Sequence, residues 1–436
     1  VRRMHNLAES ILIFDEVQAV PIKCLSMFNA AMNFLSEYCG ATIILCTATQ
    51  PELADADVPI PIRLSEPNEM IPDYEEKYQQ FRRTRIVDAT SEKHSAETLA
   101  QFVLDKATEN ISVLVIMNTK SAARKLYEEL KTQMRSQDGL NEEKLYYLST
   151  NLCPAHRMEK LYEIISKLEK NKEQKEKERV VCVSTQLIEA GVDVSFDSVI
   201  RSLAGLDSIA QAAGRCNRHG ENEIKDVYVI RSLDENLSRL PDIEYGQITT
   251  ERLLREYNEN PEFFDNDLLS PRAISVYYSY YFHEQKEKMD YIITKKLSGL
   301  AEDVTLTDLL TYNQVGRNAY KGRCKSEPPY YLPQAFSTAG DLFQVIDSDT
   351  TSVIVPYGEG ENIIEELHRV TYPPAIFKLT RKAQQFSVNL FAYEREQLAT
   401  GVYQINETGI FALDKPCYSA DYGVTLPSGD TLLLYY

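Results

Sequence analysis

The sequence has 436 residues and a formal net charge of −18, and hydrophobic and charged residues make up 43% and 26% of it. This length suits two or three soluble domains, and no run of about 18 apolar residues could span a bilayer, so no membrane segment is expected. The net negative charge argues against a surface that holds nucleic acid by bulk electrostatics, so any nucleic-acid groove must be lined locally.

The cysteines and the first residues bear on the compartment and on completeness. The eight cysteines are scattered and include no CxxC pair, which favours neither a zinc site nor a disulfide framework and fits reduced thiols in a cytoplasm. The chain begins at Val1, and its opening stretch VRRMHNLAES lacks the apolar region of a signal peptide. We therefore expect a cytoplasmic protein and a sequence that is a fragment of a longer one.

Four short apolar runs in the first half of the chain predict buried parallel strands. The stretch from Thr119 to Leu130 places alanines and leucines on one face and charged residues elsewhere, which is the pattern of a crossover helix. Strands that alternate with helices predict an α/β fold with helices on both faces of the sheet. The four predicted strands are Ile11–Phe14, Thr42–Cys46, Ser112–Met117 and Val180–Ser184.

Changes in composition divide the chain into four parts. Residues 65–84 belong to a proline- and acid-rich stretch without clean periodicity, so we expect a linker there between a first lobe at 1–64 and a second lobe at 85–232. The remainder, 233–436, holds 19 of the 27 tyrosines and is expected to form a further linker and an accessory domain. Its end is strand-rich in pattern, with apolar runs at Ser352–Tyr357, Gly409–Leu413 and Thr431–Tyr436.

The first chemical signal is the segment ILIFDEVQ, an apolar strand followed by Asp15 and Glu16. Ligands gather at the carboxyl ends of strands in an α/β sheet, and an acidic pair there can hold Mg²⁺ and orient a water molecule toward a phosphate. Solvated acids without a ligand also follow many strands, so this pattern alone does not decide between the two interpretations.

The second signal is the sequence TAT, Thr47 to Thr49, at the end of the next predicted strand. Small hydroxyl residues at that position can link the acidic pair to a neighbouring lobe through hydrogen bonds. For Thr49 alone, a helix N-cap before Pro51 explains the pattern equally well. The pairing of the two signals favours the functional interpretation.

The third signal is VVCVSTQLIEAGVDVSFD, which runs from a buried strand through a turn toward another strand. Thr185 can bond a nucleic-acid phosphate, and Gly191 and Asp193 can approach a nucleotide from the same loop. One segment that contacts both ligands suits a motor protein.

The fourth signal is QAAGRCNRHGE, interpreted as a helix that bears Gln211, Gly214, Arg215 and Arg218. Two arginines three residues apart share one side of a helix, and planar guanidinium groups suit a transferring γ-phosphate, the role of an arginine finger. A surface helix with salt bridges is the alternative, because exposed arginine pairs are common.

Together the four signals, in this order and at these strand ends, resemble the motifs of superfamily 2 helicases. The resemblance implies RecA-like parallel sheets flanked by helices, with a partial first lobe and a complete second lobe. It also implies ATP and Mg²⁺ as cofactors, with Mg²⁺ on Asp15, and single-stranded DNA as the partner. The implied roles are catalysis for Asp15, Glu16, Arg215 and Arg218; ATP binding for Gln211, Gly191 and Asp193; coupling for Gln18, Thr47 and Thr49; and DNA binding for Asn118, Thr119, Lys120 and Thr185.

Two longer stretches, RRMHNLAESILIFDEVQAVP and QAAGRCNRHGE, look like the helicase-nuclease that type I CRISPR surveillance complexes recruit to degrade invading DNA. The stretch FSTAGDLFQVIDSDTTSVIVPYGEG resembles the mixed α/β accessory domain of subtype I-C members. This family resemblance implies 3′-to-5′ movement on single-stranded DNA and a CRISPR surveillance complex as a partner. Residues Leu148–Arg157 look like a further nucleic-acid-contacting motif.

The sequence departs from the full family pattern. It contains no GxGKT loop to hold the β- and γ-phosphates, and none of its six histidines is followed by aspartate, so the HD nuclease signature is absent. We expect this chain by itself neither to hydrolyse ATP nor to unwind DNA. Gln18 stands where many relatives have histidine, and its amide can still bond across a cleft. Two alternatives remain: an interaction module that docks on a surveillance complex or on a separate front half, and a general superfamily 2 helicase.

Overall fold

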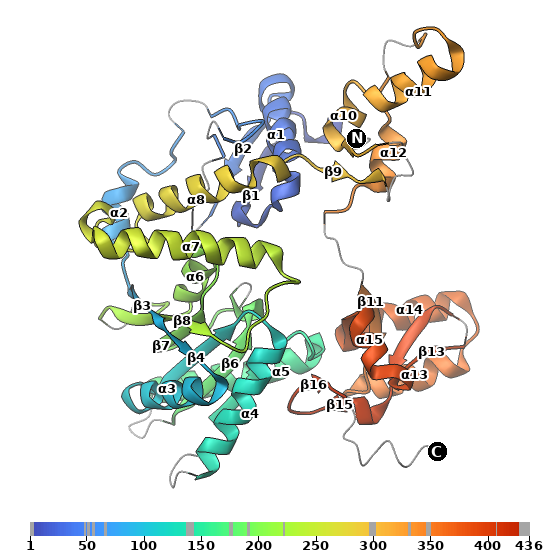
Figure 1. The fold of residues 1–436 in the computed structure, drawn as a ribbon. Helices are drawn as coiled ribbons and strands as arrows, with labels where there is room; N and C mark the ends of the chain where they lie inside the picture. Colours follow the sequence, from blue (N-terminus) through green and yellow to red (C-terminus); the bar gives the residue numbers. More distant parts are fainter. Residues whose placement is uncertain are drawn as a thin grey trace. The chain divides into compact units, whose positions relative to one another are not determined.

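The structure is a computed structural model, and it divides the chain into two compact units, each discontinuous in sequence (Figure 1). The first unit combines residues 1–80 with 248–347, and the second combines 81–247 with 348–436. The described residues are 4–47, 49, 53–54, 57–64, 68–136, 144–173, 178–189, 192–220, 223–295, 302–329, 333–345, 350–406 and 408–426.

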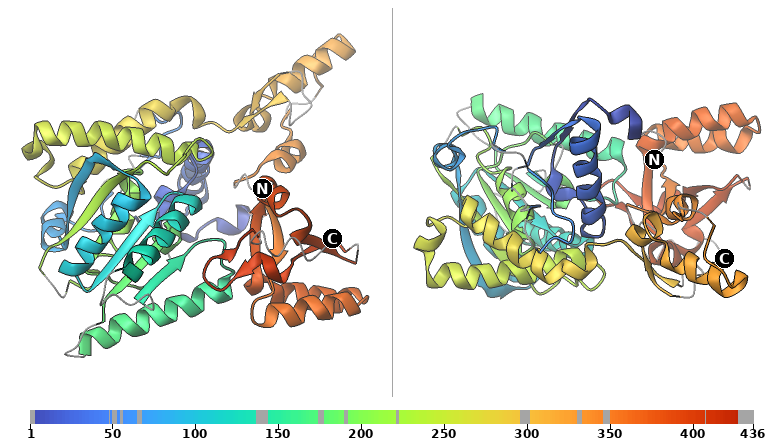
Figure 2. Two further views of the ribbon diagram at one scale, coloured as in Figure 1. Left: turned by 60° about the horizontal axis from the view of Figure 1, so that its bottom comes forward. Right: turned by 90° about the horizontal axis from the view of Figure 1, so that it is seen from above.

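The second unit is built on a six-stranded, wholly parallel sheet with the strand order β3-β8-β7-β4-β6-β5 (Figures 1 and 2). Its strands are β3 (Thr84–His94), β4 (Ser112–Met117), β5 (Leu145–Leu148), β6 (Val180–Thr185), β7 (Ser198–Ser202) and β8 (Lys225–Ser232). The helices between them are α3 (Ala96–Glu109), α4 (Lys120–Ser136), α5 (Pro154–Glu173) and α6 (Leu206–Ala213). The next helix, α7 (Pro241–Glu259), begins in this unit and ends in the first one, because the division falls between residues 247 and 248. We call β3 to β8 with α3 to α6 the second lobe.

The predicted strands and crossover helix of the second lobe are confirmed. β4 has the predicted bounds and β6 extends the predicted strand by Thr185, and every residue of both strands is buried. The apolar face of α4 is buried too, since Ala122, Ala123, Leu126 and Leu130 are at most 2% exposed. These side chains pack with α3 and with alternate residues of β4, which is the covering of a parallel sheet that the continuous apolar runs predicted.

The strand order places a topological switch point between β4 and β7. From β4 the chain moves outward to β5 and returns through β6, whereas β7 is followed by β8 on the opposite side. Open α/β sheets bind ligands outside the carboxyl ends of the strands at such a point. Asn118, after β4, and Ser202, at the end of β7, lie there.

The first unit contains a two-stranded parallel sheet of β1 (Ile11–Phe14) and β2 (Thr42–Leu45). The predicted strands are present, but the predicted burial is wrong: Ile11 and Ile13 are 68% and 65% exposed, because within the described part of the chain β1 pairs only with β2. The other elements are α1 (Leu25–Cys39), α2 (Tyr74–Gln80), α8 (Pro271–Gln285), β9 (Ile292–Ile293), β10 (Val304–Thr305), α10 (Leu306–Leu310), α11 (Gln314–Cys324) and α12 (Phe336–Leu342).

Residues 350–426, which we call the accessory domain, contain a mixed four-stranded sheet with the order β12-β11-β14-β13. The strands β11 and β14 are parallel and the other neighbours antiparallel, which confirms the predicted mixed α/β class. The predicted strand at Thr431–Tyr436 lies outside the described residues. The elements are β11 (Thr350–Ile354), α13 (Glu359–Arg369), α14 (Pro373–Ala383), β12 (Ser387–Phe391), α15 (Ala392–Leu398), β13 (Val402–Ile405), β14 (Ile410–Leu413), β15 (Tyr418–Ser419) and β16 (Gly423–Val424).

The domain boundaries at residues 64, 84 and 232 stay predictions. The stretch we assigned as one linker and accessory domain, 233–436, is divided between the two compact units.

No helix among the described residues is both long and apolar enough to cross a membrane. All eight cysteines are free thiols.

Candidate nucleotide and nucleic-acid sites

The acidic pair of the first unit lies where β1 ends. Asp15 and Glu16 are both exposed, and the Asp15 carboxylate accepts the backbone N–H of Glu16 at 3.0 Å. Glu16 has a left-handed backbone conformation (φ 56°, ψ 46°), an unusual one for a residue with a Cβ. This conformation ends the strand and turns the chain into the short helix Val17–Ala19, so the two carboxylates stay at the sheet edge.

The predicted coupling residues are hydrogen-bonded to this pair. The Gln18 amide donates to the Glu16 carboxylate, and the Thr47 hydroxyl bonds the Gln18 amide oxygen. Thr47 also accepts the backbone N–H of Thr49 at 3.1 Å. The parallel register that sets Phe14 beside Leu45 brings the two strand ends together, while Ala48 lies outside the described residues.

Tyr278 extends this series of contacts and was missed by the sequence analysis. Its hydroxyl lies 3.2 Å from the hydroxyl of Thr49, and both residues are almost fully buried. Tyr278 belongs to α8, some 230 residues along the chain from Thr49. The tyrosine-rich segment SVYYSYYF was visible, but nothing in its pattern distinguished this tyrosine from its neighbours.

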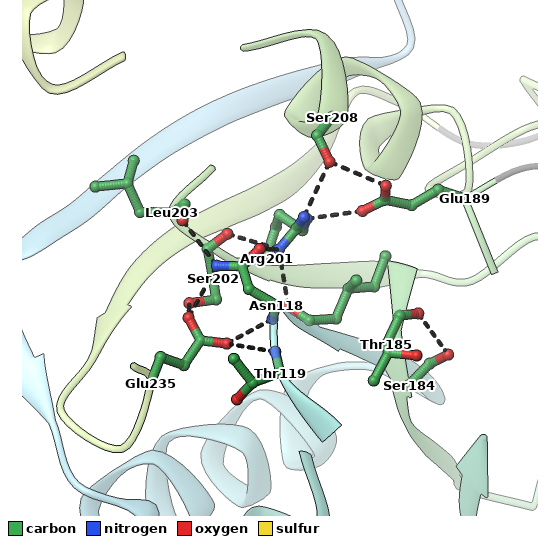
Figure 3. Close-up of polar contacts among 11 residues, drawn as sticks. Asn118, Thr119, Ser184, Thr185, Glu189, Arg201, Ser202, Leu203, Ser208 and Glu235 are labelled. Carbon is green, nitrogen blue, oxygen red and sulfur yellow. Dashed lines mark hydrogen bonds and ion pairs between the residues drawn. The ribbon is translucent and has the colours of Figure 1, made fainter. Parts of the chain in front are cut away.

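A buried polar network occupies the switch point of the second lobe (Figure 3). Its centre is Arg201, which is 0% exposed although it lies on β7 in the middle of an apolar sheet. The guanidinium donates to the Asn118 side chain at 2.7 Å and to Ser208 Oγ at 2.9 Å. Its Nε lies 2.8 Å from the Glu189 carboxylate, with which it forms an ion pair. No motif in the sequence pointed to Arg201 or Glu189.

Glu235 is a second carboxylate at this strand end, and it too was missed. It accepts from Ser202 Oγ at 2.6 Å and from the Asn118 side chain at 2.8 Å. It also accepts the backbone N–H groups of Asn118 and Thr119, which precede α4. Free N–H groups at a helix start need acceptors, so Glu235 fixes the loop after β4 in place.

The four predicted DNA-binding residues differ in how their side chains are used. Asn118 is 6% exposed, and its amide group is bonded to Arg201, Glu235 and the Leu203 carbonyl. The Thr119 hydroxyl accepts the N–H of Ala122 and so caps α4. The Lys120 ammonium pairs with Glu394 of the accessory domain. Thr185 lies at the end of β6, where it is paired with Met117 of β4. Met117 directly precedes Asn118 in the chain.

The prediction that one helix carries both Arg215 and Arg218 is wrong. The helix α6 ends at Ala213, and residues 214–220 form a turn in which Cys216 bridges to Phe196. Asn217 takes a positive φ of 47° there, which no continuing helix allows. The two arginines therefore do not share a helical face: Arg215 is 7% exposed, whereas the Arg218 side chain is 39% exposed.

The turn nevertheless brings several predicted nucleotide residues together. Arg218 Nε donates to the Asp193 carboxylate at 2.7 Å, and this contact lowers the pKa of Asp193. Arg215 donates to the backbone carbonyl of Glu189. Gln211 lies on α6 directly before the turn. Gly191 lies outside the described residues.

The accessory domain covers the motif-like stretch Leu148–Arg157 of the second lobe. Cys153 belongs to the core of the accessory domain, and its N–H donates to the Tyr418 hydroxyl at 3.2 Å. The N–H of Val424 donates to the Asn151 carbonyl at 2.9 Å. Between these contacts Gly423 has a φ of +74°, and a Cβ there would lie 2.1 Å from the Asn151 carbonyl oxygen. Only glycine permits this approach.

His156 is the titratable group at the centre of that contact. It is 4% exposed, stacks on Tyr357 with ring centroids 4.0 Å apart, and bonds the Tyr418 hydroxyl at 3.0 Å. Burial and the nearby Lys160 ammonium lower the pKa of His156 to about 4. The imidazole is therefore neutral in the docked structure at neutral pH.

The free energy of unfolding should fall as the pH is lowered from about 6.5 toward 4, because the unfolded chain then protonates His156 while the folded chain does not. The loss due to this group should be about 2 kcal/mol at pH 5. His156→Phe keeps an aromatic ring against Tyr357 and should remove that share of the pH dependence. Urea titrations at pH 7.5 and pH 5 measure it, with the surface variant His368→Phe as control. An unchanged pH response in His156→Phe would contradict the assignment.

Residues 109–221 match the family model described as CRISPR-associated nuclease/helicase Cas3, C-terminal. The matched segment runs from the end of α3 through the turn with both arginines. Over 41 residues the chain is 66% identical to the CRISPR-associated nuclease/helicase Cas3 of Haloferax volcanii, and this match covers 9% of the chain and 4% of that protein.

Two solved structures resemble the chain in fold. Cas3 of T. fusca with ATP aligns with a TM-score of 0.57 and 16% identity over 94% of this chain and 52% of that chain. A CRISPR RNA-guided surveillance complex in a pre-nicking state contains a chain that aligns with a TM-score of 0.52 and 13% identity, over 92% and 53%. The chain therefore spans about half the length of each of these two aligned chains.

The parallel sheet and its helix cover give the second lobe a RecA-like α/β fold, as in the solved Cas3 structure. In sequence, the chain is similar to the CRISPR-associated nuclease/helicase Cas3, and its residues 109–221 are a Cas3-like C-terminal segment.

Proposed function

We propose that these residues form part of an ATP-driven motor that moves along single-stranded DNA in the 3′-to-5′ direction during CRISPR interference. The observation that carries the proposal is the hydrogen-bonded series from Glu16 through Gln18 and Thr47 to Thr49. It joins the acidic pair to the coupling residues, as a motor requires if events at the nucleotide are to reach other parts of the lobe.

The residues present fit ATP and Mg²⁺. Mg²⁺ prefers oxygen ligands and is commonly held by one or two carboxylates together with substrate phosphates, which Asp15 and Glu16 can supply because both are exposed. In this proposal Arg215 and Arg218 face the γ-phosphate, and Gln211, Gly191 and Asp193 contact the nucleotide. ATP supplies the free energy of phosphoryl transfer, and the chain's residues orient it and stabilise the developing charge.

Single-stranded DNA would contact the ends of β4 and β6 in the second lobe. The candidate phosphate contacts are the hydroxyl groups of Thr119 and Thr185 and the ammonium group of Lys120. Asn118 would act indirectly by holding this loop, since its side chain is buried and already hydrogen-bonded. The net charge of −18 makes such a local set necessary, because the surface as a whole repels phosphate.

Lys120 offers a direct test of the DNA site. It is paired with Glu394 in a partly buried setting, with side-chain exposures of 24% and 14%. A phosphate must compete with that carboxylate, so Glu394→Gln should tighten oligo(dT) binding roughly fivefold, as expected for a pair worth about 1 kcal/mol. Lys120→Gln should weaken binding and reduce the salt dependence by about one phosphate contact. Fluorescence anisotropy of the 436-residue chain at several salt concentrations measures both effects.

The matched control is Glu361→Gln, which removes an acid of the same domain that pairs with Lys415. It should leave the oligo(dT) affinity unchanged. Equal affinities for Glu361→Gln and Glu394→Gln would show that Glu394 does not compete with DNA. An unchanged affinity in Lys120→Gln, alone and combined with Glu394→Gln, would remove Lys120 from the DNA site.

The proposed partner is a CRISPR surveillance complex. The similarity in fold to one chain of the pre-nicking surveillance complex supports this proposal. The resemblance of the accessory domain further supports subtype I-C. In this proposal the complete helicase-nuclease degrades the invading DNA that the motor supplies. Pull-down of the chain with a surveillance complex bound to target DNA, against the same complex without DNA, tests this partner.

A further inference from the structure

Arg201 is a buried charge that the proposed reaction does not use. It is 0% exposed on a strand whose neighbours on both sides, β4 and β8, belong to the apolar core. Removing a guanidinium from water is costly, and a buried ion pair is often no more stabilising than apolar residues of the same size. Stability alone therefore does not account for an arginine here.

One side of the Arg201 guanidinium is bonded to the DNA-site loop. Nη1 donates to Asn118 Oδ1 at 2.7 Å and to the Ser202 carbonyl at 2.8 Å. The same Asn118 side chain is held by Glu235 and the Leu203 carbonyl, so its amide orientation is determined by its partners. Asn118 directly precedes Thr119 and Lys120, the proposed phosphate contacts.

The other side of the guanidinium is bonded to the segment that supports the arginine turn. Nη2 donates to Ser208 Oγ on α6, and Ser208 in turn donates to Glu189 at 2.9 Å. Nε forms the ion pair with the same Glu189 carboxylate. The backbone carbonyl of Glu189 accepts from Arg215, the first arginine of the turn. Figure 3 shows Arg201 between Asn118 on one side and Glu189 with Ser208 on the other.

We propose that Arg201 is a positioning residue that couples the DNA site to the arginine turn of the second lobe. The contacts run from Asn118 through Arg201 to Glu189 and Arg215, and all of them lie within one lobe. When DNA displaces the loop after β4, the planar fork of Arg201 transmits the change to Glu189 and so to Arg215. A lysine keeps the charge but not the fork, so it cannot hold both sides at once. This inference rests on the proposed function.

Hydrogen exchange in the 436-residue chain tests the coupling without any need for ATP hydrolysis. Oligo(dT) should change amide exchange in the turn at residues 214–220 several-fold in the wild type. In Arg201→Lys this response should be lost, while the oligo(dT) affinity stays within about twofold of wild type. Ser208→Ala removes one link of the same network, leaves the buried charges paired, and should reduce the response in part. The matched control is Arg85→Lys, an exposed arginine of the same sheet that pairs with Asp226.

The outcomes separate the inference from the function on which it rests. A turn that responds equally in wild type, Arg201→Lys and Ser208→Ala would overturn the coupling role. A parallel loss of DNA affinity and thermal stability in both variants would make Arg201 structural and would also overturn it. Absence of oligo(dT) binding by the wild-type chain would refute the proposed function and the inference together. In a protein that also has a phosphate-binding loop, Arg201→Lys should reduce DNA stimulation of ATP hydrolysis roughly tenfold.

Discussion

Replacing Arg218 with alanine should lower ATP hydrolysis about 1,000-fold or more in a protein that joins these residues to a phosphate-binding loop. The reason is that a guanidinium stabilises the charge that develops on the transferred phosphoryl group. Arg218 is the more exposed of the two arginines in the turn, and its contact with Asp193 orients the side chain. Steady-state phosphate release measures the effect, and oligo(dT) binding should be largely unchanged.

The control for Arg218 is Arg85→Ala, which removes an exposed arginine on β3 of the second lobe that also has a carboxylate partner, Asp226. Its turnover should match the wild type. Near-normal turnover by Arg218→Ala would contradict the finger assignment. If Arg215→Ala alone abolished turnover, the finger would be Arg215, whose guanidinium is 7% exposed and bonded to the Glu189 carbonyl.

Glu189→Ala should destabilise the second lobe by about 3–5 kcal/mol, because it leaves the Arg201 guanidinium buried without its counter-charge. Glu189 is 6% exposed, and its carboxylate contacts both Arg201 and Ser208. Burial raises the pKa of Glu189, whereas the adjacent Arg201 guanidinium lowers it. The charged form of Glu189 is therefore stabilised by Arg201, and each partner needs the other. Urea unfolding followed by circular dichroism measures the loss.

Two further variants serve as controls for Glu189→Ala. Asp193→Ala removes an exposed carboxylate from the same segment and should leave the unfolding midpoint in place. The double variant Glu189→Leu, Arg201→Met replaces both charges with apolar side chains and should recover much of the lost stability. A stability loss in Glu189→Ala no larger than in Asp193→Ala would show that the pair is solvated rather than buried.

The strands of the fold were predictable because each is a compact apolar run. Ile11–Phe14 and Ser112–Met117 have the predicted bounds, and Val180–Ser184 differs by one residue. Burial was less predictable, because it depends on which strands pair: β4 is enclosed by neighbours on both sides, while β1 has only β2 beside it within the described residues. The same apolar pattern thus gives a buried strand in one unit and an exposed one in the other.

The sequence located the strand-end residues but not their partners. Arg201 and Glu235 are joined to Asn118 across 83 and 117 residues of chain, and Tyr278 is joined to Thr49 across 229. Local patterns carry no information at that range, so a buried arginine in VIRSL and a tyrosine among four aromatic neighbours looked ordinary. The arginine turn was misassigned because the small residues after Gln211 suit a helix, whereas Gly214 ends it and Cys216 pairs with Phe196.

The docking of the accessory domain also depends on distant contacts. Asn151 meets Val424 across 273 residues, and the fit requires glycine at position 423. The stretch Leu148–Arg157 was interpreted from its family resemblance as a nucleic-acid motif. In the structure Asn151, Cys153 and His156 contact the accessory domain, so these residues serve the docking of that domain.

We propose that these residues serve a motor that is driven by ATP and stimulated by single-stranded DNA. The most direct test is the rate of ATP hydrolysis, with and without oligo(dT), by a protein in which a GxGKT-bearing segment precedes this chain. Hydrolysis should rise on addition of oligo(dT) and be lost in Glu16→Gln, and the 436-residue chain alone should be inactive. Hydrolysis that is indifferent to single-stranded DNA, or that persists in Glu16→Gln, would contradict it.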